Sequence, residues 1–229
     1  MMQVEKMPKK IAIDGPAASG KSSVGKRVAE ILDYIFLDTG IMYRAVTYAV
    51  LQAGIDVNDE DAVGHLAESI KIEIEKSPTQ SGRNYTIFID KKDVTQYLRT
   101  HEVNTYVSIV SRYRRVRNAM TEQQRMIGGE GAIVMAGRDI GTVVLPDADL
   151  KIYLEATPQE RARRRHQEER VKGIIVPYED ILKNVKMRDE IDSTREIAPL
   201  KPARDAYIIN TDGKDILQVT QEILGIIGV

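Results

Sequence analysis

The most chemically specific segment of this sequence is a glycine-rich octapeptide, Gly15-Pro16-Ala17-Ala18-Ser19-Gly20-Lys21-Ser22, which matches G-x-x-x-x-G-K-[ST] at every fixed position. Glycines in such a loop let successive backbone N–H groups turn inward around phosphate oxygens. In this pattern Lys21 reaches the β- and γ-phosphates, and the Ser22 hydroxyl ligates Mg²⁺. A strand-like apolar run precedes the loop and helical apolar spacing follows it, as the motif requires. The segment therefore predicts a site for a nucleoside triphosphate.

Two further pairs of polar residues come after strand-like runs. Thr39 and Arg44 follow one run, and Arg138 and Asp139 follow another. Ligands of doubly wound sheets bind beyond the carboxyl ends of the strands, so we expect Thr39 and Arg44 to face a second substrate. A solvated helix position for Arg44, and a purely structural ion pair for Arg138 and Asp139, remain open as alternatives.

A third charged set lies on a predicted helix near the C-terminus. Steps of four and three place Arg188, Asp192 and Arg195 on one helical face. Upstream, Ile181 and Val185 continue that face with apolar side chains. A face that changes from apolar to charged indicates a helix that leaves the core to border a cleft. An ordinary salt-bridged surface is the alternative.

Arginines also crowd the segment between residues 158 and 172. In an enzyme that transfers phosphoryl groups, such a segment is typical of a lid that brings arginines over the phosphate. Arg161 and Arg165 are our candidates for contacts with the triphosphate. A solvated helix face would show the same composition.

The elements that must position these residues alternate along the chain. Short apolar runs near residues 10–14, 34–38, 132–135, 150–154 and 206–210 are separated by helical segments. This alternation predicts a three-layer α/β fold with a five-stranded parallel sheet. Thr157 followed by Pro158 and, three residues after the cap, Glu160 marks a helix start.

Residues 64–130 interrupt this rhythm. The runs 71–75 and 85–90 alternate apolar and polar residues, which indicates antiparallel strands, and Ser77 to Asn84 between them reads as a turn. We therefore predict an insertion with a small antiparallel sheet. The predicted organisation is a core domain of residues 1–63 and 131–229, an insertion of residues 64–130, and a lid segment of residues 158–172.

Composition narrows the classes of function. The chain has no cysteine, which excludes disulfides and thiolate chemistry. A net charge of −1 argues against general affinity for nucleic acids or membrane surfaces. No apolar run approaches the roughly 20 residues that span a bilayer, and the N-terminus lacks a signal-peptide pattern. We expect a cytoplasmic monomer.

The last strand-like run ends in Asn210-Thr211-Asp212-Gly213 rather than a guanine-reading N-K-x-D segment, which favours a small-molecule kinase over a GTPase.

Four motifs, in order along the chain, resemble those of bacterial cytidylate kinases. They are IAIDGPAASGKSS (Ile11 to Ser23), LDTGIMYR (Leu37 to Arg44), AGRDIGTVVLPDADLKIYL (Ala136 to Leu154) and RDEIDSTREIAPL (Arg188 to Leu200). The resemblance covers nearly the whole chain. It implies phosphoryl transfer from ATP, with Mg²⁺, to CMP or dCMP. It also makes the insertion the enlarged monophosphate-binding region and the arginine-rich segment the short lid.

The resemblance also implies roles for individual residues. Ser23 joins the loop residues that bind ATP. Thr39 and Arg44 fall where the family contacts the acceptor nucleotide and its phosphate. Positions that read the cytosine edge correspond to Ser108, Arg117 and Asp139. Phosphate contacts correspond to Arg138, Arg188 and Arg195, and Asp192 is the position that holds the pentose hydroxyls.

One position departs from the family pattern. Ala136-Gly137-Arg138-Asp139 stands where these kinases commonly have D-G-R-D. The missing aspartate would lie near the Mg²⁺ and hold its water shell. Ser22 and Asp38 are then the candidates that remain for this contact.

The implied reaction needs charge neutralisation rather than a general base. A monophosphate is already ionised at neutral pH, because its second pKa is about 6. Lys21, Arg44, Arg138, Arg188 and Arg195 are the candidate neutralising residues. Two other functions remain open: a kinase of a small hydroxylated metabolite, with Asp38 or Asp139 accepting the hydroxyl proton, and a non-catalytic ATP-binding sensor.

Overall fold

The computed structural model describes residues 7–76, 85–129, 131–171 and 173–229. The chain forms two compact units. We call Met1–Asp38 together with Ile127–Val229 the core unit, and Thr39–Met126 the second unit. Each unit is built around a sheet of its own. Among the described residues, no helix has both the length and the apolar composition needed to cross a membrane.

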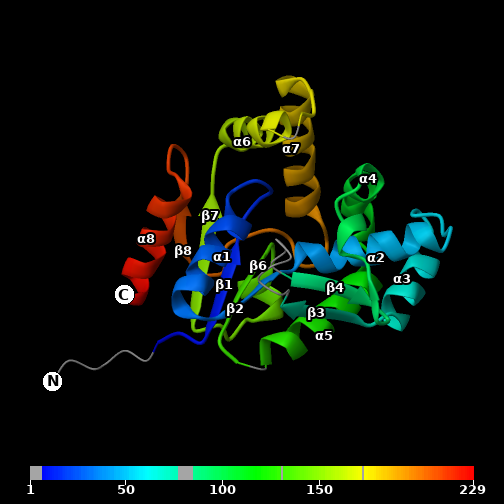
Figure 1. Cartoon of the computed structure of the whole chain (residues 1–229), viewed down its shortest axis with the longest axis horizontal. Coiled ribbons are helices and arrows are strands. Elements are labelled where there is room, and N and C mark those ends of the chain that lie inside the picture. Colours follow the sequence, from blue (N-terminus) through cyan, green and yellow to red (C-terminus); the bar gives the residue numbers. More distant parts are fainter. Residues whose placement is uncertain (1–6, 77–84, 130, 172) are drawn as a thin grey trace. The chain divides into compact units, whose positions relative to one another are not determined.

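The core unit contains a five-stranded sheet in the order β2-β6-β1-β7-β8 (Figure 1). Its strands are β1 (Lys10–Asp14), β2 (Ile35–Asp38), β6 (Ile133–Gly137), β7 (Leu150–Glu155) and β8 (Tyr207–Asn210). Every pairing between neighbouring strands is parallel. The predicted five-stranded parallel sheet is confirmed.

Apolar side chains of two helices pack against this sheet. Helix α1 (Lys21–Leu32) contributes Val24 and Val28, and helix α8 (Ile216–Ile227) contributes Val219 and Ile223. All four are almost fully buried in one cluster with residues of the central strands. The continuous apolar character of β1, buried on both faces, is what parallel sheets require. This packing fixes the end of β1 and the start of α1, and so the loop between them.

A second helix pair completes the core unit. Helices α6 (Pro158–Val171) and α7 (Tyr178–Thr194) lie side by side around a small cluster of Ala162, Ile181 and Val185 (Figure 1). The backbone N–H of Glu160 donates to Thr157 Oγ1 at 3.3 Å. The predicted helix start at Thr157 is therefore confirmed.

The second unit combines helices with an antiparallel sheet in the order β3-β4-β5. Its elements are α2 (Gly40–Gln52), α3 (Glu60–Ser69), β3 (Ile72–Lys76), β4 (Tyr85–Ile89), β5 (Lys92–Asp93), the short 3₁₀ helix η2 (Thr95–Tyr97), α4 (His101–Val110) and α5 (Arg114–Gly129). The last three residues of α5 belong to the core unit. The two predicted antiparallel strands are confirmed, and β5 adds a third. The predicted turn from Ser77 to Asn84 lies outside the described residues.

The second unit begins at Thr39, whereas the sequence predicted an insertion that begins at residue 64. The reason is the packing of α2, which makes its main helix contacts with α4 and α3. In the sequence, α2 follows β2 as any crossover helix of a parallel sheet would, so its partners could not be recognised.

A buried carboxylate ties β1 to a distant segment of the core unit. Asp14 is the last residue of β1 and only 3% exposed. Its two oxygens accept hydrogen bonds from the backbone N–H groups of Ile140 (2.8 Å) and Gly141 (2.7 Å), at the start of the single-turn π-helix η3 (Ile140–Val144). Burial raises the pKa of Asp14 to about 6, against the lowering effect of these two hydrogen bonds.

This pKa makes the stability of the fold depend on pH. Between about pH 4 and 6 the folded protein keeps a proton on Asp14 that the unfolded chain has lost, so the free energy of unfolding falls as the pH rises. The full change amounts to about 3 kcal/mol. Asp14→Asn removes this titration. Urea unfolding from pH 4 to 7 should therefore show the wild type losing its stability advantage over the variant, and a constant difference would contradict the role of Asp14.

Candidate functional site

The loop between β1 and α1 has the conformation of a phosphate cradle. Gly15 has φ = +147°, and a Cβ at this position would lie 2.1 Å from the Leu154 carbonyl oxygen, so only glycine fits. Ala18 (φ = +60°) and Gly20 (φ = +96°) are also left-handed. Helix α1 begins at Lys21 without a side-chain cap, which leaves its first N–H groups available to an anion.

Lys21 is buried against this loop. Its Nζ donates to the Pro16 carbonyl at 2.6 Å and lies 3.4 Å from Ser19 Oγ. Burial lowers the pKa of Lys21 well below its ordinary value, and the nearby guanidinium of Arg138 lowers it further. An anion bound in the loop would favour the charged form of this lysine.

Oxygen ligands suited to Mg²⁺ lie at the start of α1. The Ser22 hydroxyl donates to Asp38 Oδ2 at 2.6 Å, so a hydroxyl and a carboxylate meet here. Asp38 pairs across the sheet with Ala136, the position that departs from the family pattern. The described residues hold no cluster of three or more histidine or acidic side chains that could bind a metal alone. Two oxygen ligands fit Mg²⁺, which keeps several waters and relies on substrate phosphates.

Residues after β6 and at the end of α7 join in a buried charge network. Arg138 Nε donates to Asp192 Oδ2 at 2.8 Å. Arg195 lies between two carboxylates, with Nη1 3.6 Å from Asp192 Oδ1 and Nη2 3.7 Å from Asp139 Oδ1. Burial acts to raise the pKa of Asp192, but the guanidinium groups of Arg138 and Arg195 outweigh it and hold the pKa below its usual value. The pair Arg138 and Asp139 and the helical set with Asp192 and Arg195, which the sequence analysis treated separately, therefore form one network.

Arg188 has an incompletely satisfied guanidinium. Its Nε is buried and has no hydrogen-bond partner in the part of the chain that the structure describes. Burial lowers its pKa from the usual arginine value, and the like charge of Arg138 adds to this effect. A buried donor without an acceptor is costly, and a phosphate oxygen would remove that cost.

The predicted lid arginines differ in their surroundings. Arg161 binds Asp189 and two backbone carbonyls, whereas Arg165 pairs with Glu168 and Glu169 of its own helix. Arg164, which the sequence did not single out, binds Thr211 and Glu160. Lys172 lies outside the described residues.

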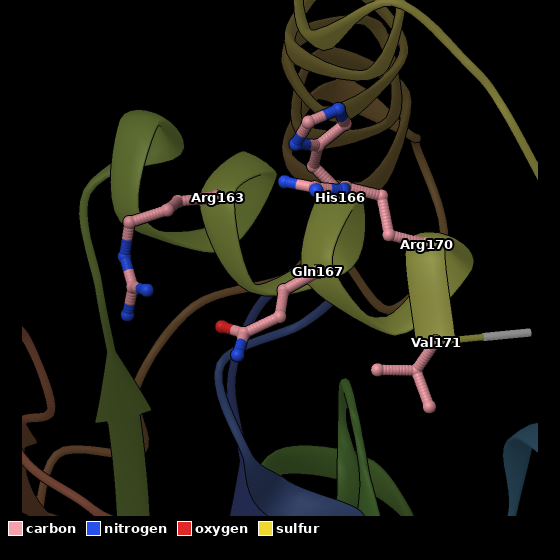
Figure 2. Close-up of a pocket in the computed structure, with 5 residues that line it drawn as sticks. All are labelled: Arg163, His166, Gln167, Arg170 and Val171. Atoms are coloured by element: carbon pink, nitrogen blue, oxygen red, sulfur yellow. The ribbon is translucent and has the colours of Figure 1, made fainter.

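A hollow of about 520 Å³ runs along α6 itself (Figure 2). Its lining residues come from successive turns of that helix: Arg163, His166, Gln167, Arg170 and Val171. None of them belongs to the phosphate-binding loop, so the hollow alone does not define a nucleotide site.

In the second unit, α2 carries two of the predicted acceptor residues. Thr39 is buried at the start of the helix. Arg44 Nη1 donates to Asn104 Oδ1 at 2.7 Å and to the Leu98 carbonyl at 3.2 Å. Asn104 thus orients Arg44 from α4, and no spacing pattern in the sequence indicated that pairing.

The other two predicted residues of this unit lie on α4 and α5. Arg117 is 2% exposed, and its guanidinium stacks 5.2 Å from the centre of the Tyr43 ring. Its Nη1 also donates to the Ser111 carbonyl at 3.0 Å. Ser108 is half-buried on α4. The candidate residues therefore fall into two groups, with Thr39, Arg44, Ser108 and Arg117 in the second unit and the others in the core unit.

Comparisons with known proteins cover almost the whole chain. Residues 11–228 match the family model described as cytidylate kinase. The cytidylate kinase of Bacillus subtilis strain 168 is 46% identical over 93% of this chain and 94% of its own length, and that of Bacillus licheniformis is 47% identical over 95% of each. A solved structure of an uncharacterised protein from Eubacterium ventriosum ATCC 27560 shares the fold, with a TM-score of 0.50 at 12% identity over 95% of this chain and 97% of its own. On the family model and these relatives, the chain belongs to the cytidylate kinase family.

Proposed function

We propose that this protein transfers the γ-phosphoryl group of ATP to CMP or dCMP, giving ADP and CDP or dCDP. The relatives named above support the choice of substrate. The observation that carries the chemistry is the buried cationic cluster beside a phosphate-binding loop, in which Lys21 and Arg188 both have lowered pKa values. A phosphate anion bound beside these two groups would favour their charged forms.

The donor site follows from the loop. Gly15 to Ser23 would surround the triphosphate with backbone N–H groups, and Lys21 would contact the β- and γ-phosphates. Arg165 would approach the triphosphate from α6. Ser22 and Asp38 would hold Mg²⁺, which neutralises charge on the β- and γ-phosphates when it is bound.

The acceptor residues are assigned by their matching family positions. In the second unit, Thr39 and Arg44 would contact the monophosphate nucleotide, and Ser108 and Arg117 the cytosine. In the core unit, Asp139 would contact the base and Asp192 the pentose hydroxyls. The phosphates would be bound by Arg138, Arg188 and Arg195.

The structure favours a phosphate acceptor over an alcohol. A kinase of hydroxylated metabolites needs a carboxylate that accepts the proton of the attacking hydroxyl. Asp38 accepts the Ser22 hydrogen bond, and Asp139 faces the guanidinium of Arg195. Neither is set up as a base, whereas an ionised phosphate needs none. Catalysis then rests on alignment and on buried positive charge, which acts strongly at low local dielectric.

A phosphoryl-transfer assay across acceptors tests this function. With ATP and Mg²⁺, we expect rapid turnover of CMP and dCMP, slower turnover of UMP and AMP, and none of shikimate or gluconate. Turnover confined to a hydroxylated acid would replace the proposal with the alcohol kinase. Intact ATP binding without turnover of any acceptor would support a sensor.

Removing one buried cation should slow the chemical step. Because each such contact stabilises charge in the transition state, we expect Lys21→Ala and Arg188→Ala each to lower kcat at least ~100-fold. Lys186→Ala, an exposed lysine on the same helix as Arg188, is the matched control and should leave kcat unchanged. Turnover close to wild type in Lys21→Ala or Arg188→Ala would remove these residues from the mechanism.

Restoring the family aspartate should create dependence on Mg²⁺. Side chains of paired residues on neighbouring parallel strands project to the same face, so Ala136→Asp would place a second carboxylate beside Asp38. Without a cation we expect repulsion to lower the melting temperature by about 5 °C. Mg²⁺ should recover most of that loss and affect the wild type less. Equal effects of EDTA and Mg²⁺ on both proteins would argue against a metal site here.

A further inference from the structure

Arg161, at the first turn of α6, has every nitrogen of its guanidinium committed to the protein. The side chain is almost completely buried. Nε donates to the Ala156 carbonyl at 3.0 Å, and Nη1 donates to Asp189 Oδ1 at 2.9 Å and to the Ala17 carbonyl at 3.2 Å. Nη2 binds the other oxygen of Asp189. This two-pronged pair with Asp189 is the geometry that holds an arginine most rigidly.

The contact with Ala17 bears directly on the phosphate-binding loop. The carbonyl of Ala17 and the N–H of Ala18 belong to one planar trans peptide, so they point in opposite directions. When Arg161 holds the carbonyl, the N–H of Ala18 is turned away from Arg161. Ala18 itself has φ = +60°, a conformation that costs a non-glycine residue about 1 kcal/mol or more. An external contact on this peptide therefore helps to keep the loop in its cradle shape.

Asp189 is what makes this contact possible. A guanidinium buried as deeply as Arg161 needs a partner charge, and Asp189 supplies it from α7. Asp189 directly follows Arg188, whose buried Nε has no acceptor within the described part of the chain. The pair therefore connects the loop to the helix that carries the candidate phosphate ligand.

A second arginine on the same helix face binds a residue that lies next to the loop. Arg164 Nη1 donates to Thr211 Oγ1 at 3.0 Å, and the Thr211 hydroxyl lies 3.4 Å from the Ser19 carbonyl. The same hydroxyl lies closer to the Glu155 carbonyl, at 3.1 Å, so Arg164 holds Thr211 beside the loop, whereas Arg161 bonds directly to a loop carbonyl. Both contacts go to protein groups.

We propose that Arg161 is a positioning residue of the donor site: with Asp189 as its counterion, it holds the Ala17 peptide so that the loop is preformed for the triphosphate, and it does not bind the phosphates itself. The inference rests on the proposed binding of ATP by this loop. It replaces the sequence-based expectation that Arg161 contacts ATP.

A double-mutant cycle separates positioning from direct contact. The variants are Arg161→Met, Asp189→Asn and the double variant, and the measurement is the Kd for ATP without acceptor, followed by KM for ATP and for CMP. If Arg161 acts through Asp189, each single variant should weaken ATP binding about tenfold, the scale of one hydrogen bond to a charged group. The double variant should bind ATP at least as tightly as whichever single variant has the higher Kd. KM for CMP should stay unchanged.

The opposite outcomes are equally clear. If Arg161 binds the phosphates directly, Asp189→Asn frees it, so ATP affinity stays the same or rises while Arg161→Met loses it. A purely structural role would lower the melting temperature of the variants and leave the Kd unchanged. Either result overturns the proposal. Should Arg161→Met fail to fold, the direction of the change in Asp189→Asn alone decides.

The control is Arg163→Met, an exposed arginine paired with Glu160 on the same helix, which should leave the Kd for ATP unchanged. Failure of the proposed function gives a different result. In that case the wild type binds ATP without phosphorylating CMP, and the Kd values of the four proteins in the cycle still test the role of Arg161.

Discussion

The candidate site of the core unit brings several positive charges close together in a buried or half-buried environment. Burial disfavours the charged forms of both Lys21 and Arg188, and the nearby guanidinium of Arg138 lowers the pKa of each of them further. Proteins tolerate such clusters only with compensating anions. Asp192 supplies part of that compensation. Asp38 and Asp14 also favour the charged form of Lys21. A bound phosphate would add a further anion, and so would favour the charged forms that burial disfavours.

The backbone around this cluster is held by contacts that do not involve a nucleotide. Asp14 fixes η3 to the end of β1, Arg161 connects α6 to the Ala17 carbonyl of the loop, and Arg164 connects α6 to Thr211 beside the loop. Because these contacts set the directions of the peptide groups, the N–H groups of the loop need little reorganisation when phosphate binds. Preorganisation of this kind is the main source of electrostatic catalysis, since the dipoles are oriented at the cost of folding rather than of the reaction.

The sequence allowed local features to be predicted and left long-range partners undetermined. The loop, the five parallel strands and the Thr157 cap follow from residue types at short, fixed spacing, and the comparisons or the structure confirm them. The partners of Arg161, Arg44 and Asp14 lie 28, 60 and 126 residues away along the chain. Periodicity carries no information at such separations, so the contacts of Asp14, Asn104 and Asp189 were not recognised.

The pairing of the carboxylates also bears on the kind of acceptor. In the core unit the acidic side chains near the loop accept hydrogen bonds or face guanidinium groups: Asp38 accepts from Ser22, Asp192 from Arg138, and Asp189 from Arg161. Each pair occupies and orients its carboxylate, which suits a positioning role rather than proton abstraction. An enzyme that must deprotonate an alcohol needs the reverse, a carboxylate with an unoccupied oxygen near the reacting group. The distribution of partners therefore matches a substrate that is already an anion. The buried Nε of Arg188, which has no acceptor among the residues that the structure describes, points to the same kind of substrate.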